Sequence, residues 1–164
     1  MSKRTKASSV ALGGVLAALA VVIMAMGGLI PAATFVCPML CMLILAVVLN
    51  QCGSQIGWAW YGAVAILGAL LGPDKEAAAL FVFLGYYPIL KPKLDKLPCK
   101  WLWKAMLFNA AILLMYWVLM NLFGMAALVE EFAEMGAVLT AITLILGNVT
   151  FFLLDLVLSR RFRV

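Results

Sequence analysis

Between two long apolar segments of the chain lies the stretch Tyr86-Tyr-Pro-Ile-Leu-Lys-Pro-Lys-Leu-Asp-Lys-Leu-Pro-Cys-Lys-Trp-Leu-Trp-Lys104, which carries five of the 12 basic residues. Aromatic residues stand on both of its shoulders. Trp and Tyr rings settle at the headgroup level of a bilayer, and Lys in a short loop stays on the side that is not translocated. The pattern is therefore typical of a cytoplasmic loop in a membrane protein. If this loop is inside, the orientation of every other segment follows.

The composition also indicates an integral membrane protein. Hydrophobic residues make up 67% of the 164 residues, charged residues make up 12%, and the mean hydropathy is +1.15. A soluble domain carries roughly 25% charged residues and is about half apolar. The chain has too few polar residues to cover a water-soluble surface. Its length suits one domain over residues 1–164, without a separate soluble catalytic domain.

Hydropathy predicts six apolar segments separated by polar turns. A helix of about 20 residues crosses a hydrocarbon core of ~30 Å. The expected spans are residues 10–30, 32–50, 58–71, 77–90, 101–123 and 137–158. The third and fourth are short. An amphipathic segment with Glu130, Glu131 and Glu134 at helical spacing precedes the last span and is expected at the interface. The predicted fold class is an all-α membrane protein, a bundle of six transmembrane helices with both termini on the same side.

The basic residues are distributed unevenly across this topology. With the termini inside, the inner ends hold eleven of the 12 Lys and Arg, and the outer loops hold only Lys75. The positive-inside rule then places both termini in the cytoplasm, and we expect the plasma (inner) membrane of a bacterium. The net charge of +5 reflects this topology and contact with anionic membrane lipid, and it does not indicate a nucleic-acid partner.

No motif of an enzyme occurs in the sequence. G-x-S-x-G, H-E-x-x-H and P-loop patterns are missing, so the chain cannot hydrolyse ATP by itself. The lack of His removes His-based metal sites and proton relays. Cys37 and Cys41 stand on one helix face and offer soft ligands of the Cu(I) type, but Cys in an apolar helix usually acts as a small hydrophobe. We predict no catalytic residues, no metal and no other cofactor.

Small residues are concentrated in the first span. Gly13 with Ala17, and Gly14 with Ala18, form small-xxx-small pairs that allow a second helix to approach closely. That second helix belongs either to the same bundle or to a partner membrane protein. The spacing does not separate these two interpretations.

Two polar pairs are predicted between the fifth and sixth spans. Asn109 and Asn148 fall near mid-depth if these spans run antiparallel, and an amide–amide hydrogen bond is favoured over a ligand contact. Lys104 and Asp155 lie nearer the inner ends, where ionisable groups pair if they can. An ion pair is favoured over a proton relay, because one acid without a second relay group makes a poor path.

The outer half of the bundle holds the candidate substrate-binding residues. A pocket for a small molecule needs apolar and aromatic walls with a few polar groups. The candidates are Thr34, Trp117, Asn121, Glu134, Thr140 and Thr143. For Trp117, a position that only faces lipid is the alternative.

Two segments of the chain resemble helices of the substrate-binding S components of energy-coupling factor (ECF) transporters. The segment Lys6-Ala-Ser-Ser-Val-Ala-Leu-Gly-Gly-Val-Leu-Ala-Ala-Leu-Ala-Val-Val22 is similar to their first helix, with small residues at four-residue spacing. The segment Tyr61-Gly-Ala-Val-Ala-Ile-Leu-Gly-Ala-Leu-Leu-Gly72 is similar to their third helix. The resemblance implies a protein that binds a vitamin-like micronutrient in an outward-facing pocket. It also implies that the protein topples in the membrane when it docks on a shared module with two ATPases.

The resemblance assigns roles to residues of this chain. The two small-residue pairs of the first span would form the face that docks on the coupling subunit, and Trp117, Asn121 and Thr140 would lie near the substrate. No motif specific to one vitamin class is present, so the substrate stays open. The first alternative is a membrane scaffold that binds partner membrane proteins, which predicts no ligand-sized pocket and polar residues that satisfy one another. The second is a stand-alone carrier or channel, which would need a polar stripe along a pore.

Overall fold

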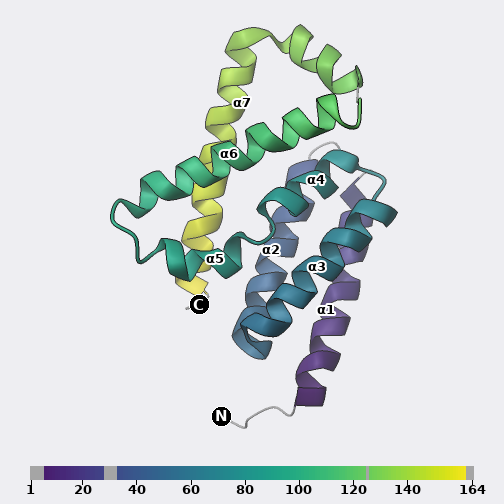
Figure 1. The fold of residues 1–164 in the computed structure, drawn as a ribbon, viewed down its shortest axis with the longest axis vertical. Helices are drawn as coiled ribbons and strands as arrows, with labels where there is room; N and C mark the ends of the chain where they lie inside the picture. The colour runs from purple at the N-terminus through teal and green to yellow at the C-terminus, as the bar shows by residue number, and fades with distance from the viewer. Residues whose placement is uncertain (1–5, 28–32, 125, 162–164) are drawn as a thin grey trace.

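The computed structural model describes residues 6–27, 33–124 and 126–161, and this part of the chain is helical without any strand. Its helices are α1 (Lys6–Met26), α2 (Ala33–Cys52), α3 (Ser54–Leu71), α4 (Lys75–Leu84), α5 (Tyr87–Leu94), α6 (Lys100–Asn121) and α7 (Ala126–Arg161). Figure 1 shows α1 to α4 grouped together, with α6 and α7 crossing beside them. The start of α1 and the end of α7 lie toward the same end of the molecule (Figure 1).

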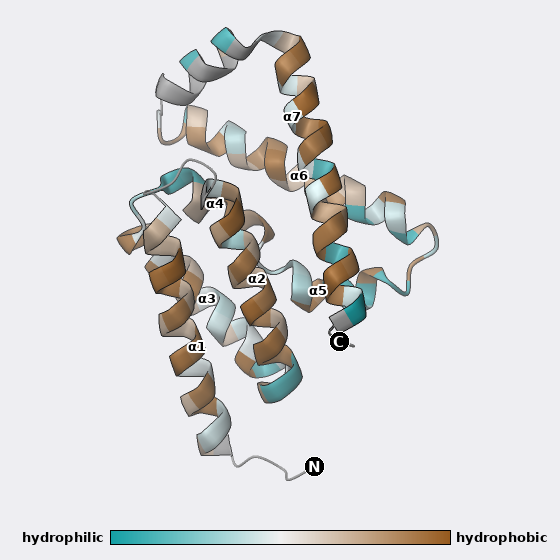
Figure 2. Ribbon diagram, turned by 180° about the vertical axis from the view of Figure 1, so that it is seen from behind, coloured by the Kyte–Doolittle hydropathy of each residue, from teal (hydrophilic) through white to brown (hydrophobic). Residues whose placement is uncertain are grey.

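Five helical segments in the described ranges are long and apolar enough to cross a membrane. They are Ala7–Met26, Thr34–Cys52, Ser54–Leu71, Lys100–Asn121 and Gly136–Arg160. Apolar residues run along α1, α2 and α7, while hydrophilic residues gather at helix ends and in the connection from α5 to α6 (Figure 2). The all-helical class and the membrane-type helices agree with the sequence analysis, but the number of long spans is five.

The fourth expected span, residues 77–90, is not one helix. It is divided between α4 and α5 by a turn at Gly85 and Tyr86. Pro88 has no N–H to donate to the carbonyl of Leu84, four residues earlier, and its ring would crowd that carbonyl. At Gly85 an added Cβ would lie 2.4 Å from the carbonyl oxygen of Phe81, so a side chain has no room there. Gly85 itself keeps a helical φ of −59° and ψ of −25°, so the donor missing at Pro88 is the local constraint that ends α4 after 10 residues.

The other boundaries differ less from the expected ones. The helix α3 begins at Ser54, before the expected residue 58, and its 18 residues give it the length of a full span. Gly53, with a φ of 86°, separates it from α2 in a conformation that L-residues with a side chain rarely adopt. The predicted end of the first span and start of the second, residues 28–32, lie outside the described residues.

The core of the bundle forms around α2. This helix packs against α1, α3 and α4, and more lightly against α5 and α7. Cys41, Leu45, Ala46 and Val48 are fully buried on it. Cys37 is also buried, and the thiol of Cys41 donates to the carbonyl of Ala20 at 3.5 Å. Both cysteines thus contribute to packing in the core.

The helix α7 has two parts, which meet at Gly136. This residue has a φ of 67° and a ψ of 171°, so the helix axis changes direction there. The first part is the amphipathic segment expected at the interface; Glu130 and Glu134 are exposed on it, and the side chain of Glu131 lies outside the described residues. The second part is the last span. Only 11% of its most apolar stretch of 18 residues is buried within the molecule, so most of its surface is available to lipid.

Candidate functional site

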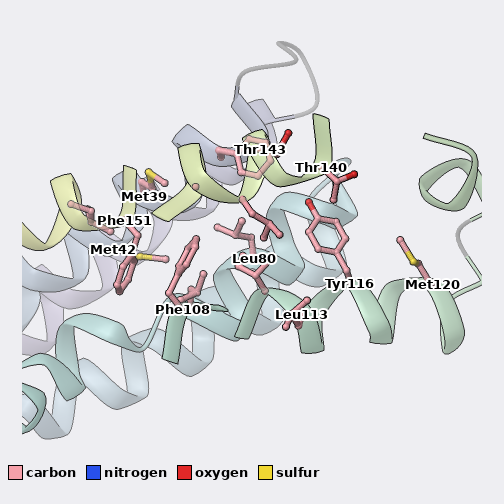
Figure 3. A pocket seen from close by; sticks show the side chains of 16 residues that line it. Met39, Met42, Leu80, Phe108, Leu113, Tyr116, Met120, Thr140, Thr143 and Phe151 are labelled. Carbon is pink, nitrogen blue, oxygen red and sulfur yellow. The ribbon is translucent and has the colours of Figure 1, made fainter. Parts of the chain in front are cut away.

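A cavity of about 180 Å³ lies where α2, α4, α6 and α7 meet. Of the described residues that line it, none is charged. Four are aromatic and three are methionines, and Figure 3 shows Phe108 and Tyr116 rising from α6 beside the threonines of α7. The polar atoms of the lining side chains are the hydroxyls of Tyr116, Thr140 and Thr143. The cavity therefore has apolar walls and a small number of oxygen atoms.

The three hydroxyl groups already donate hydrogen bonds to the protein. Thr140 donates to the carbonyl of Gly136 at 2.9 Å, and Thr143 donates to the carbonyl of Leu139 at 3.0 Å. The hydroxyl of Tyr116 donates to the carboxylate of Glu76 at the start of α4. Because their protons are engaged, these groups present acceptor oxygens, and a ligand would find no ready donor among them.

Exposed residues on three different helices border the cavity. Phe35 of α2 is 41% exposed, Leu113 of α6 is 64% exposed, and Thr143 of α7 is also exposed. All three belong to segments apolar and long enough to cross a membrane. The open side of the cavity thus lies between helices, where lipid chains would surround the protein.

The lining follows a spacing that is present in the sequence but was not used to predict it. Phe108, Ile112, Tyr116 and Met120 all line the cavity and recur every four residues along α6. This spacing places them on one helix face. The facing stripe of α7 includes Gly147, where an added Cβ would lie 3.4 Å from the ring of Phe108. The four-residue repeat on α6 is the feature of the sequence that indicates this lining face.

Of the six predicted substrate-binding residues, the structure brings only Thr140 and Thr143 of α7 to this cavity. Trp117 is 61% exposed, and Asn121 donates to its carbonyl at 2.9 Å. Each follows a lining residue, and one step along a helix turns a side chain by about 100°. Glu134 is exposed on the amphipathic part of α7. Thr34 does not line the cavity, and its hydroxyl donates to the carboxylate of Asp74 at 2.7 Å.

Toward the end of the molecule where α7 finishes, five side chains form a charged cluster, and all of them except Asp95 are buried. They are Tyr87, Lys91, Asp95, Lys104 and Asp155. Lys91 and Lys104 donate to the two oxygens of Asp155 at 2.6 and 2.9 Å, and Tyr87 donates to the same carboxylate. Asp155 and Lys104 are each 2% exposed, and Lys91 is 4% exposed. Asp95 pairs with both lysines, at 3.0 Å to Lys91. Two ammonium groups therefore face two carboxylates, and their formal charges balance.

The charged cluster extends the predicted Lys104–Asp155 pair. The sequence predicts Lys91 in a cytoplasmic loop, but α5 carries its side chain into the protein, whereas Lys93, Lys96 and Lys100 are exposed. Tyr87, Lys91 and Asp95 recur every four residues, and this spacing could have identified the cluster. At Asp95, partial burial raises the pKa of the carboxyl, but hydrogen bonds from Lys104 and Lys91 outweigh it and hold the pKa below its usual value.

The two predicted asparagines form a reciprocal pair between α6 and α7. Asn109 donates to Asn148 at 3.0 Å, and Asn148 donates back at 3.1 Å. Each amide also donates to the carbonyl four residues earlier, Ala105 at 2.8 Å and Leu144 at 2.9 Å. This arrangement is a structural link between the helices, and neither asparagine lines the cavity.

The four small residues of α1 divide between two faces. Gly13 is buried against α3, where an added Cβ would lie 3.4 Å from Ile56, and Ala17 is half-buried. Gly14 and Ala18 are exposed, and an added Cβ at Gly14 would meet nothing within 4 Å. The first pair packs within the bundle, and the second pair lies on an outer face.

Compared with known proteins, the chain matches no family model, no curated protein and no solved structure.

Proposed function

We propose that this chain is the membrane-embedded substrate-binding subunit of an uptake transporter for a small organic, vitamin-like micronutrient, and that it works with an external ATP-driven coupling module. The single observation that carries the proposal is the cavity between α2, α4, α6 and α7. Clefts between helices with apolar and aromatic walls and a few polar atoms are where membrane and soluble bundles hold small molecules. A scaffold has no need of such a cavity.

The size of the cavity supports a small ligand. An apolar cavity of about 150 Å³ accepts benzene, and drug-sized ligands occupy roughly 300–1,000 Å³. At about 180 Å³, this cavity suits a molecule of one or two rings. The two threonines of α7 remain substrate-binding residues under the proposal.

The topology under this proposal has six crossings, with the N- and C-termini in the cytoplasm of a bacterial cell. Five long helices alone would leave the termini on opposite sides of the membrane. The broken pair α4–α5 supplies the sixth crossing, and broken helices are tolerated at membrane depth when they are buried in protein. Phe81, Leu84 and Tyr87, around the break, are each at most 2% exposed. The Lys-rich connection from α5 to α6 then lies inside, as the positive-inside rule requires.

Under this proposal, another protein supplies the coupling module with its ATPases. The exposed pair Gly14 and Ala18 on α1 is the docking face in this proposal. Small residues on an outer helix face permit close contact with a helix of another membrane protein. The same face also supports the second candidate, a membrane scaffold that binds partner proteins without a ligand.

The experiment that tests the proposal is native mass spectrometry of the full chain, purified gently with its partners. A stoichiometric small molecule together with a co-purified membrane subunit is the expected result. A co-purified membrane protein with no small molecule, unchanged by a panel of vitamins, would favour the scaffold. A homo-oligomer that retains neither would favour a stand-alone carrier.

Substitutions on α1 test the docking face separately. Gly14→Leu with Ala18→Leu should abolish co-purification of the partner and leave ligand binding intact, since neither residue is buried. Ala63→Leu is the matched control, because Ala63 is an exposed small residue of α3. Equal co-purification in the α1 double variant and in the control would contradict the assignment of the docking face.

A further inference from the structure

We propose that the ligand of the cavity is a neutral aromatic molecule of one or two fused rings, such as a substituted benzene or an indole. This inference rests on the proposed function, because it names the substrate class of that same cavity. It depends on four properties of the lining: its charge, its hydrogen-bonding capacity, its aromatic content and its opening.

The lining disfavours an anionic ligand. None of the described lining residues carries a charge, and the hydroxyls of Tyr116, Thr140 and Thr143 donate to protein oxygens. A carboxylate or phosphate in this cavity would lose its water and find no donor in exchange, and burying an ion without partners is costly. The lysines of the charged cluster do not compensate, because their ammonium groups contact Asp95 and Asp155.

The hydroxyl oxygens can still serve a neutral ligand. A hydroxyl that donates one hydrogen bond keeps lone pairs for accepting another. Thr140 and Thr143 therefore offer acceptors to a ligand with a single N–H or O–H group. An indole N–H or a phenol O–H is of this kind.

The apolar walls are suited to a flat ring. Phe35 of α2, Phe108 and Tyr116 of α6, and Phe151 of α7 place aromatic rings on three sides of the cavity, and Met39 and Met42 add sulfur atoms from α2. The close-up in Figure 3 shows Phe108, Tyr116, Phe151 and the two methionines around one space. Edge-to-face ring contacts and sulfur–ring contacts add attraction beyond the burial of apolar area. An aliphatic ligand of equal size would gain only the burial.

The opening fits a ligand that is soluble in the bilayer. The exposed residues Phe35, Leu113 and Thr143 lie on membrane-type segments, so the cavity opens between helices. A neutral ring partitions into lipid and can reach this opening without crossing a polar surface. A charged micronutrient would have to enter through hydrocarbon, which its charge makes unfavourable.

The experiment uses 5-fluoroindole as the probe and the full chain in nanodiscs of a saturated phosphatidylcholine, with binding followed by ¹⁹F NMR. We expect a saturable bound resonance from one site per chain, distinct from the signal of probe dissolved in lipid. Thr143→Phe, which places a ring at the mouth of the cavity, should weaken binding at least tenfold. Leu113→Trp, at another exposed lining position, is the second blocking variant.

The chain offers a closely matched control in Thr150→Phe. Thr150 lies on the same helix, is exposed, and donates to the carbonyl four residues earlier at 2.8 Å, as Thr143 does at 3.0 Å, but it does not line the cavity. Thr150→Phe should bind the probe with unchanged affinity. Equal binding by Thr143→Phe, Leu113→Trp and Thr150→Phe would place the probe outside the cavity and overturn the inference.

The failure of this inference is distinguishable from failure of the proposed function. If native mass spectrometry finds a charged micronutrient that Thr143→Phe removes and 5-fluoroindole does not displace, the proposed function stands and the aromatic class is overturned. If 5-fluoroindole never saturates and a phospholipid is retained that Thr143→Phe removes, a lipid chain fills the cavity and the inference is likewise overturned. If no molecule is retained and no probe binds, both proposals fail together.

Discussion

Replacing Asp155 by Asn removes the negative charge at the centre of the charged cluster while keeping the size of the side chain. Asp155 is 2% exposed and accepts hydrogen bonds from Lys91 at 2.6 Å, Lys104 at 2.9 Å and Tyr87. In Asp155→Asn, two buried ammonium groups face a single remaining carboxylate, Asp95. The new amide nitrogen of Asn would be a hydrogen-bond donor that faces another donor. The net charge of the cluster rises from zero to plus one in a site with little water.

The size of the effect follows from what remains of the cluster. Removing one partner of a buried ion pair costs about 3–5 kcal/mol, because the other charge stays buried without compensation. Asp95 keeps its contacts with Lys91, at 3.0 Å, and with Lys104, but its side chain is 37% exposed and water screens it. We therefore expect the lower end of this range, a loss of about 3 kcal/mol in the free energy of unfolding, or roughly 150-fold in the unfolding equilibrium constant.

The assay is reversible unfolding in mixed micelles with a rising fraction of SDS, followed by the fluorescence of the five tryptophans. Asp95→Asn is the control, since it makes the same chemical change at a half-exposed carboxylate. It should cost less than Asp155→Asn, because the side chain of Asp95 is 37% exposed and water screens its charge. Restoring the charge balance with Lys104→Met in the Asp155→Asn background should recover at least ~1 kcal/mol. Two results would refute the electrostatic reasoning. One is an unfolding free energy of Asp155→Asn within about 0.5 kcal/mol of the wild type, the scale of an ordinary surface substitution. The other is a double variant that is no more stable than Asp155→Asn alone.

Three further predictions concern α1, the asparagine pair and pH. Gly13→Leu should lower stability by about 1–3 kcal/mol because its side chain is forced against α3, whereas Gly14→Leu should leave the SDS midpoint unchanged; equal midpoints would contradict the assigned faces. Asn109→Leu and Asn148→Leu should each cost about 1 kcal/mol by leaving an amide without its partner, and the double variant should cost less than the sum, which a double-mutant cycle measures. The folded-state pKa of Asp95 is lowered, so its contribution is present above the unfolded pKa of about 3.9 and is lost as pH falls through the folded pKa. Below about pH 4 the wild type should therefore lose more stability than Asp95→Asn. If the unfolding free energies of the two proteins fall equally with pH, this linkage is contradicted.

Features that depend on position along a helix could be predicted from the sequence. Long apolar runs bounded by Gly, Pro and charged residues indicate helices that span a membrane, and the structure has five of the expected segments as long helices. Depth along a span follows from the helical rise, which is why Lys104 could be paired with Asp155, and Asn109 with Asn148, before any contact was known. The break at Gly85 was equally local, because Pro88 removes a donor that a continuous helix needs. The hydropathy of residues 77–90 predicts one continuous span, and only the proline indicates the break.

Rotation of a helix about its axis and the choice of its neighbours depend on packing among distant segments. Gly13 and Gly14 are adjacent in the sequence and chemically identical, yet one faces α3 and the other an outer surface. The reason is that α2 and α3 cover part of α1 and leave the rest open. Trp117 was predicted at the substrate and Tyr116 was not, although a single residue step separates the lining face of α6 from its exposed face. The cavity needs walls from four helices: α7 approaches α6 closely at Gly147, and α2 and α4 supply the remaining walls. Local sequence thus determines which segments are helical and how deep each residue lies. The cavity arises only when α2, α4, α6 and α7 pack together, and the charged cluster only when α5, α6 and α7 do.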